Sequence, residues 1–386
     1  MKELLKAEDI KACITAHIIR NPLWQDKDVN IFYIVNQMAG CFTKKSKSYH
    51  YKKFFNTSIN QIKDKKILAN LVKEEVFMTE YSGHAHKISL DIVEKIVEEN
   101  NPSSEYIIVI AGGDGTSLEV QTKLFLTAQT DSQKAQKIKN QITILRLPLG
   151  TGNDGTDGHS MEETIQLLSG NLKCENQPAV KVYPENPVTK EQILASGKNP
   201  KKYNPDDPQY PWYSFNIASI GLDAFVVYMT NAVKKKMPGN FYQFCVPISA
   251  FVYDKPFPSG IAKMEFFDEN NNKIYEESNP ITIFVFGASG HRYYGGGHYI
   301  LPTQDNVCHA PKITIPQLIK VNRQFIDGSF VGGGIAFLHT AKKVRFSYDQ
   351  PILLQCDGEV AMLCKDHFPL IFEITEPCLR TIVKNV

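Results

Sequence analysis

Two short glycine-rich segments, each directly after an apolar run, contain the residue types that could do chemistry. The first is AGGDGTSLEV at 111–120, after YIIVI, and the second is PLGTGNDGTDG at 148–158, after ITILRL. Glycine lets a backbone turn tightly and brings amide groups close to an anion. A helix is predicted to begin near Thr116, and its unpaired N–H groups would point at the same anion. Both segments therefore indicate phosphate binding.

Polar residues within these segments add a second kind of chemistry. Asp114 would repel a phosphate unless a divalent cation lies between them, or unless it orients water or a ribose. Thr151 could bond a phosphate, while Asn153 and Asp154 could hold the nucleotide, the water shell of a metal ion or the loop itself. The plainer alternatives are a glycine–aspartate turn in the first segment and a helix cap in the second.

A third candidate is CDGE at 356–359, which follows the apolar run PILLQ. An Asp-Gly pair between apolar strands is a strong signal for a β-hairpin. Such a turn can also present a carboxylate.

The first part of the chain alternates strands with helices. Apolar side chains at helical spacing over residues 1 to about 20 predict an amphipathic helix that packs on the body. Alternation predicts a parallel sheet covered on both faces, with ligands bound at the carboxyl ends of its strands. The expected strands are 29–35, 73–78, 106–111 and 142–147, and the expected helices between them are 49–64 and 87–99.

The pattern changes after Gly170. Residues 184–211 are rich in Pro, Lys, Asn and Asp and predict a loop or insertion. Beyond them, short strand-like segments, including KITIPQL at 312–318, predict a mostly antiparallel second domain with one helix near 222–237. VKKKMPGNFYQF at 233–244 suits an anionic bilayer surface, or alternatively a solvated helix end followed by a core-facing helix.

Composition excludes several classes of function. The net charge is +2, from 43 basic and 41 acidic residues, so binding to a polyanion through bulk charge is excluded and no nucleic-acid partner is expected. No apolar run approaches the roughly 20 residues of a membrane-spanning helix, and the start of the chain lacks a secretory signal, so we expect a cytoplasmic protein. Neither the eight cysteines nor the ten histidines have the spacing of a zinc site.

Taken together, the motifs resemble the catalytic domain shared by diacylglycerol kinases, sphingosine and ceramide kinases and bacterial lipid kinases. The resemblance covers roughly residues 30–375 and rests on VNQMAG, GGDGT with Glu119, LPLGTGND, FNIASIGLDA, the GGG of YYGGGHYILP, and LLQCDGE, in that order. It implies a phosphofructokinase-like α/β nucleotide-binding domain followed by an antiparallel β-sandwich domain. The expected parts are a helical extension at 1–28, the ATP-binding domain at 29–170, the lipid-substrate domain at 171–372 with the insertion at 184–211, and a segment at 373–386 that could return to the first domain.

The resemblance also implies roles for single residues. Glu359 would be the proton acceptor, with Asp357 beside it as the alternative, and Asp114 and Asp154 would organise Mg²⁺ through water. The residues expected to bind ATP are Asn36, Thr79, Gly112, Gly113, Asp114, Gly115, Thr116, Gly150, Thr151, Gly152 and Asn153.

The expected function is an ATP- and Mg²⁺-dependent kinase that phosphorylates a lipid hydroxyl, with diacylglycerol as the first acceptor, at a membrane surface to which it binds peripherally. A sphingoid base or another lipid is an alternative acceptor, and a homodimer is an open alternative to a monomer. Three departures from the family leave an inactive nucleotide- or lipid-binding protein as an alternative of another class. GTDG follows GTGND, Leu118 stands where Asn is usual, and NVCHAPKIT lacks the Asp-Gly of a structural cation site. A kinase of a soluble substrate is disfavoured by GTGND and the late DGE.

Overall fold

The computed structural model describes residues 3–385 except 151, 154, 190, 193–210, 235–244, 246–247, 250–251, 259 and 295–296. The chain forms two compact units, Met1–Gln177 with Pro377–Val386, and Pro178–Glu376. The first unit therefore continues past the expected boundary at residue 170, and the chain returns to it at 377 rather than 373. The reason is strand pairing, since β5 (Leu172–Gln177) and β19 (Leu379–Lys384) are neighbours in the sheet of the first unit.

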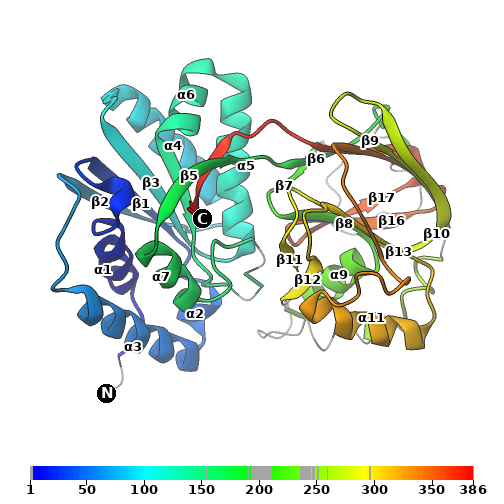
Figure 1. The fold of residues 1–386 in the computed structure, drawn as a ribbon, viewed down its shortest axis with the longest axis horizontal. Helices are drawn as coiled ribbons and strands as arrows, with labels where there is room; N and C mark the ends of the chain where they lie inside the picture. The colour runs from blue at the N-terminus through cyan, green and yellow to red at the C-terminus, as the bar shows by residue number, and fades with distance from the viewer. Residues whose placement is uncertain are drawn as a thin grey trace. The chain divides into compact units, whose positions relative to one another are not determined.

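A six-stranded sheet in the order β2-β1-β3-β4-β19-β5 forms the centre of the first unit (Figure 1). Its first five strands are parallel, and β5 is the antiparallel edge. All residues of β1 from 29 to 35 are buried, because helices cover both faces of the sheet. The expected strands agree to within two residues with the observed β1 (Asp28–Val35), β2 (Val72–Met78), β3 (Ser104–Ala111) and β4 (Ile142–Arg146).

Two helical layers cover this sheet (Figure 1). One contains α4 (His84–Glu99), α5 (Asp114–Thr130) and α6 (Ser132–Asn140), and the other contains α1 (Ala7–Ile18), α3 (Lys45–Ile62) and α7 (Met161–Ser169), with the short α2 (Gly40–Thr43) beside α3. Ile10, Ile14 and Ile18 of α1 are fully buried in the core of the unit. The amphipathic helix expected near the start of the chain is therefore present and packs on the α/β unit, to which the segment at 1–28 belongs.

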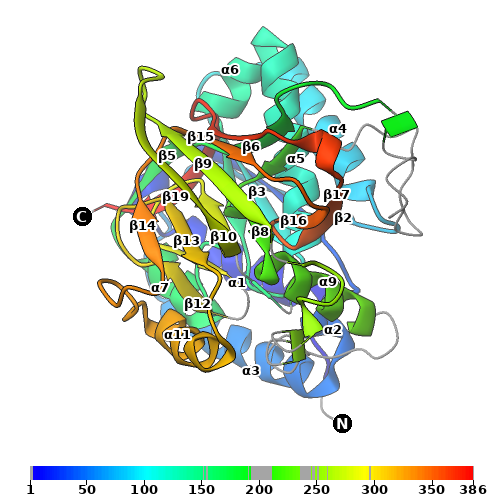
Figure 2. The same ribbon diagram turned by 90° about the vertical axis from the view of Figure 1, so that its right-hand side faces the viewer.

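An 11-stranded antiparallel sheet dominates the second unit (Figure 2). Its long strand β10 (Lys273–Gly287) belongs to two halves, because residues 273–280 pair with β9 (Ile261–Phe267), whereas residues 281–287 pair with β8 (Ile217–Gly221) and β13 (Val307–Pro311). The remaining strands of the sheet are β6 (Val180–Pro184), β7 (Trp212–Ser214), β14 (Phe337–His339), β15 (Lys343–Ser347), β16 (Ile352–Cys356), β17 (Glu359–Leu363) and β18 (Leu370–Ile374).

The two halves of this sheet face each other across an aromatic core. Phe284 lies with its ring centroid 5.0 Å from those of both Phe346 and Phe372, which belong to the opposite half. Helices α9 (Leu222–Lys234) and α11 (Ile315–Asp327) contribute to a second apolar cluster of the unit, and β11 (Arg292–Tyr294) pairs with β12 (His298–Leu301). The expected fold class, an α/β unit followed by an antiparallel β unit, is confirmed.

One element prediction in the second unit is wrong. KITIPQL was expected to be strand-like, but α11 begins within it at Ile315. Thr314 and Gln317 form a capping box, in which the Thr314 backbone N–H donates to Gln317 Oε1 at 2.8 Å, and Pro316 lies in the first turn. These start signals are local, and the apolar β-branched residues before them concealed the helix. No helix within the described ranges is long and apolar enough to span a membrane.

Candidate active site

The parallel strands of the first unit all end at the same edge of the sheet, and the candidate residues follow directly after them. The Asn36 backbone N–H, just after β1, donates to the carbonyl of Ala111 at the end of β3, at 3.0 Å. The Thr79 N–H, just after β2, donates to the carbonyl of Val35 at 2.9 Å. These bonds extend the pairing of the strands and hold Asn36 and Thr79 at the edge where a parallel sheet binds ligands.

Gly112 and Gly113 connect β3 to α5. A Cβ atom on Gly112 would lie 2.8 Å from Thr116 Cβ, so the first turn of α5 folds over this position and requires glycine there. Asn36 Nδ2 donates to Thr116 Oγ1 at 3.0 Å and ties that turn to the end of β1. The first N–H groups of the 17-residue helix α5 have no partner within the helix, and their dipole favours an anion at Gly113.

The second glycine segment contacts the first directly. A Cβ atom on Gly150 would lie 2.7 Å from Gly113 Cα, so the two backbones approach each other at these glycines. Asn153 holds the arrangement, because its Oδ1 accepts from the Gly150 N–H at 2.8 Å and its own N–H donates to Asp114 Oδ2 at 3.1 Å. Its φ of 64° is in the left-handed region, which asparagine tolerates. Of the roles left open for Asn153, holding the loop is the one observed.

An ion pair that the sequence analysis missed anchors the second loop. Asp157, with 3% of its side chain exposed, pairs with Arg146 at the end of β4, with 10% exposed. The Arg146 backbone N–H donates to Asp157 Oδ2 at 2.6 Å, and Arg146 Nη1 donates to Gln121 Oε1 on α5 at 3.1 Å. The GTDG sequence that departs from the family is therefore held to β4 through Arg146, which also contacts α5. An arginine and an aspartate 11 residues apart give no specific signal in a sequence.

Glu119 also has a definite position. Its Oε1 accepts from the Gly83 N–H at 2.8 Å and its Oε2 from the Ala85 N–H at 3.3 Å, so it caps the start of α4. Glu119, which the sequence analysis grouped with GGDGT, thus joins α5 to the start of α4.

The site fits the group expected there. Glycines at 113 and 150 leave backbone without side chains at the start of α5, which is the arrangement that admits a phosphate. Asp114 is half-buried beside them and provides the hard oxygen ligands that Mg²⁺ prefers. Gly115 is exposed in the first turn of α5, and Gly152 is half-buried in the second loop. Thr151 and Asp154 lie outside the described residues.

In the second unit, CDGE forms the predicted hairpin. Cys356 pairs with Glu359, and the two residues between them, Asp357 and Gly358, have φ values of 46° and 90°. Positive φ at both central positions is the requirement of a type I′ turn. The hairpin prediction is confirmed, and Glu359 is exposed at the start of β17.

Asp357 is an acceptor for four donors of its own unit. Its Oδ1 accepts from Ser214 Oγ and from the N–H groups of Asn216 at 3.1 Å and Ile217 at 3.2 Å, and its Oδ2 accepts from the Phe215 N–H at 2.6 Å. Burial raises the pKa of Asp357 above its ordinary value, while these donors act in the opposite direction. The carboxylate thus anchors the connection between β7 and β8.

The structure therefore groups the candidate residues in two sets, one in each unit. Asn36, Gly112, Gly113, Asp114, Thr116, Gly150 and Asn153 lie together at the sheet edge of the first unit, and Thr79 follows the neighbouring strand. Most of the basic-aromatic segment 233–244 and two of the three glycines at 295–297 lie outside the described residues.

Comparison with known proteins connects this site to a family. Residues 32–178 match the family model of the diacylglycerol kinase catalytic domain. No curated protein matches the chain. Among solved structures, a diacylglycerol kinase from Bacillus anthracis strain Sterne is 13% identical with a TM-score of 0.51, covering 92% of this chain and 97% of that chain. A second diacylglycerol kinase-like protein of that organism is 15% identical with a TM-score of 0.53, covering 92% and 95%.

At these identities the solved structures establish the shared fold and nothing finer. The family match is independent of them and includes both glycine segments and every candidate residue of the first unit. Residues 32–178 are therefore similar to the diacylglycerol kinase catalytic domain, whose motifs the sequence resembles.

Proposed function

We propose that the protein is an ATP- and Mg²⁺-dependent lipid kinase that transfers the γ-phosphate of ATP to a lipid hydroxyl, with diacylglycerol as the first acceptor. The contact between Gly113 and Gly150 at the start of α5 is the observation that supports this most strongly. Two glycine backbones and a helix N-terminus at one sheet edge form a binding place for phosphate groups. The family match of the same segment supports phosphoryl transfer over simple anion binding.

In this proposal each residue has one task. The N–H groups at the start of α5 and the backbone at Gly113 and Gly150 bind the phosphates. Asp114, with Asp154, would hold the water shell of Mg²⁺. Asn153 holds the second loop beside Asp114 through its hydrogen bonds to Gly150 and Asp114. Bound Mg²⁺ supplies charge neutralisation during phosphoryl transfer.

The acceptor side of the reaction requires a base. In the proposed step the lipid hydroxyl oxygen bonds to the γ-phosphorus, the bond to ADP breaks, and the hydroxyl proton passes to the Glu359 carboxylate. Asp357 keeps the hairpin in place through its four donors, so it acts by positioning Glu359. Because diacylglycerol is dissolved in membranes, we also propose that the protein works at the cytoplasmic surface of a membrane, bound peripherally.

A panel assay with labelled ATP tests this function. The acceptors are diacylglycerol, monoacylglycerol, ceramide, sphingosine and phosphatidylglycerol in mixed micelles, with NAD as a soluble acceptor. Transfer to diacylglycerol is expected to exceed transfer to the others. Transfer to a different lipid would support the lipid kinase and change the proposed acceptor. Transfer to NAD alone would refute a lipid acceptor and support a kinase of a soluble substrate. Binding of ATP without transfer to any acceptor would refute the kinase and support a nucleotide-binding protein.

A further inference from the structure

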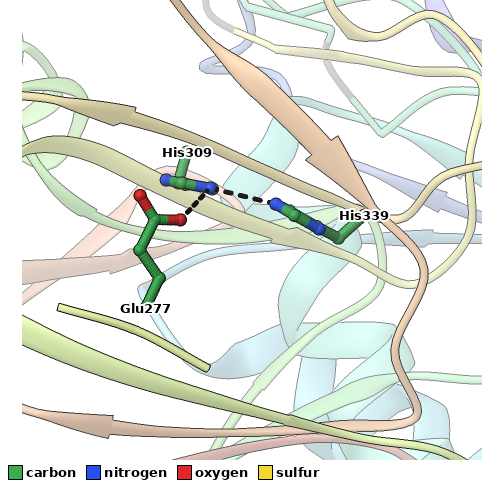
Figure 3. Close-up of side chains that lie close together, drawn as sticks. All are labelled: Glu277, His309 and His339. Carbon is green, nitrogen blue, oxygen red and sulfur yellow. Dashed lines mark hydrogen bonds and ion pairs between the residues drawn. The ribbon is translucent and has the colours of Figure 1, made fainter. Parts of the chain in front are cut away.

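Three side chains of the second unit converge on one point that the proposed kinase chemistry does not use. They are Glu277 of β10, His309 of β13 and His339 of β14, and one ligand atom of each lies within 4.8 Å of the others (Figure 3). His309 Nε2 lies 3.0 Å from His339 Nε2 and 3.2 Å from Glu277 Oε2. Figure 3 shows both imidazole rings and the carboxylate pointing toward this place.

Strand pairing explains why residues 30 or more apart in sequence meet here. Val307 of β13 pairs with His339 of β14, and His309 lies two positions further along β13 on the same face. The two histidines are therefore diagonal neighbours on one face of the sheet. Glu277 approaches from the half of β10 that pairs with β9, whereas His309 pairs with Phe284 in the other half. The cluster thus joins the two halves of the sheet.

Two of the three distances within the cluster match those between ligands of a small cation, and the third, between Glu277 and His339, is at most 4.8 Å. Zinc binds nitrogen and oxygen ligands at about 2.0–2.1 Å in tetrahedral geometry, which places neighbouring ligand atoms about 3.3 Å apart. The observed 3.0 Å and 3.2 Å agree with this spacing within a few tenths of an ångström. Two imidazoles and one carboxylate are also a ligand set that zinc accepts, and they leave a fourth position for water.

The two imidazole rings face each other through their Nε2 atoms. Without an ion, the two facing Nε2 atoms can form a hydrogen bond only if one of them holds a proton and the other does not.

Surrounding groups hold the three side chains in place. Tyr275 Oη donates to Glu277 Oε2 at 2.9 Å, and Asn279 Nδ2 donates to Glu277 Oε1. Aromatic rings flank the histidines, with Tyr275 4.7 Å from His339 and Phe337 5.4 Å from His309 between ring centroids. Contacts of this kind orient metal ligands and limit the access of water.

One feature of the cluster opposes metal binding. His309 Nδ1 is buried and has no hydrogen-bond partner among the described residues. A ligating imidazole usually donates its second N–H to an acceptor, so this atom would leave a bound ion less well supported. In structural sites with four protein ligands, the free energy of zinc binding is larger than the cost of one unpaired buried N–H group.

We propose that Glu277, His309 and His339 bind a divalent transition-metal ion, with Zn²⁺ as the best fit, and that this ion links β10 with β13 and β14. The site lies in the second unit, whereas the expected Mg²⁺ site lies in the first. Its donors also differ, because they are two nitrogens and one oxygen in place of oxygens alone. Glu277 is the more accessible partner of its contact with His309, with 17% of its side chain exposed against 0% for His309.

The test measures metal binding on the full chain without a histidine tag, after removal of metal with a chelator. One Zn²⁺ per chain is expected by calorimetric titration and by elemental analysis, with a higher melting temperature of the loaded protein. Co²⁺ should give the intense visible absorption of a four-coordinate site. His339→Gln and Glu277→Gln should each weaken Zn²⁺ binding at least about 100-fold, whereas the control His50→Gln, at an exposed histidine of the first unit, should leave it unchanged.

Each alternative outcome has a definite meaning. Equal affinity in the wild type and in both cluster variants would overturn the proposal, as would a wild type that retains no stoichiometric Zn²⁺. If one variant fails to fold, the other variant and the Co²⁺ spectrum of the wild type still decide. The assay contains neither ATP nor lipid, so its result is independent of the proposed kinase activity.

Discussion

Replacing Asp357 by Asn separates a structural role from a chemical one. Asn has one acceptor oxygen where the carboxylate has two, so one acceptor position is filled by an NH₂ group. In the wild type the Phe215 N–H donates to Oδ2 at 2.6 Å. If the amide oxygen of the variant takes the place of Oδ1, its NH₂ group faces this N–H. A charge-assisted bond is lost, and the Phe215 N–H loses this acceptor at a residue that is only 5% exposed. We expect the connection between β7 and β8 to lose about 2–4 kcal/mol.

Hydrogen exchange measured by mass spectrometry detects this loss where it occurs. A peptide covering 213–220 contains the three backbone donors, and a loss of about 2–4 kcal/mol should accelerate its exchange about 30-fold or more. Glu359→Gln is the matched control on the same hairpin, because it removes the charge of an exposed side chain. It should leave the exchange of this peptide unchanged and lower phosphoryl transfer. Wild-type exchange in Asp357→Asn, or equal acceleration in both variants, would refute the anchoring role.

Three further predictions concern the first unit. Gly150→Ala should weaken ATP binding in a titration and lower the free energy of unfolding by about 1–3 kcal/mol, because its Cβ would lie 2.7 Å from Gly113 Cα. The control Gly170→Ala, with nearest contacts of 3.4 Å, should be neutral. Unchanged ATP affinity in Gly150→Ala would contradict the close contact of the loops. Asp157→Asn should lower the unfolding free energy of this unit by about 3 kcal/mol in urea titrations, since it breaks a buried ion pair, and a wild-type midpoint would show that the pair contributes little. Burial lowers the pKa of His17 from 6.5 to about 4, so the unfolded chain binds more protons between these values. Stability should be complete above pH 6.5 and fall by about 3 kcal/mol toward pH 4, and the same pH dependence in His17→Gln would exclude this residue as the cause.

The sequence predicted the α/β unit well because its signals are local and repeated. Strands buried on both faces are continuous apolar runs, and each glycine segment directly follows one of them. The carboxyl ends of parallel strands meet at one edge, so strand order alone was enough to bring Asp114 and Asn153 together. The hairpin at Asp357 could also be predicted from the sequence, since only a few residue pairs form a type I′ turn and Asp-Gly is one of them.

The features that the sequence did not reveal depend on long-range pairing. The ion pair of Arg146 with Asp157 requires the second loop to fold back onto β4. The cluster of Glu277, His309 and His339 requires the register of three strands, and its members have none of the short spacings that mark a zinc site. The anchoring role of Asp357 could not be seen in the sequence, because its four donors lie about 140 residues away.

Transfer of labelled phosphate from ATP to diacylglycerol by the wild type, Asp114→Asn and Glu359→Gln tests the central claim most directly. If Asp114 organises Mg²⁺ and Glu359 accepts the proton, each variant should lower turnover by at least roughly 100-fold. Glu359→Gln should still bind ATP with wild-type affinity, because residue 359 belongs to the second unit and the proposed phosphate site to the first. A wild type that binds ATP and phosphorylates no lipid would contradict the proposed kinase, and two variants of near-wild-type turnover would contradict its active site.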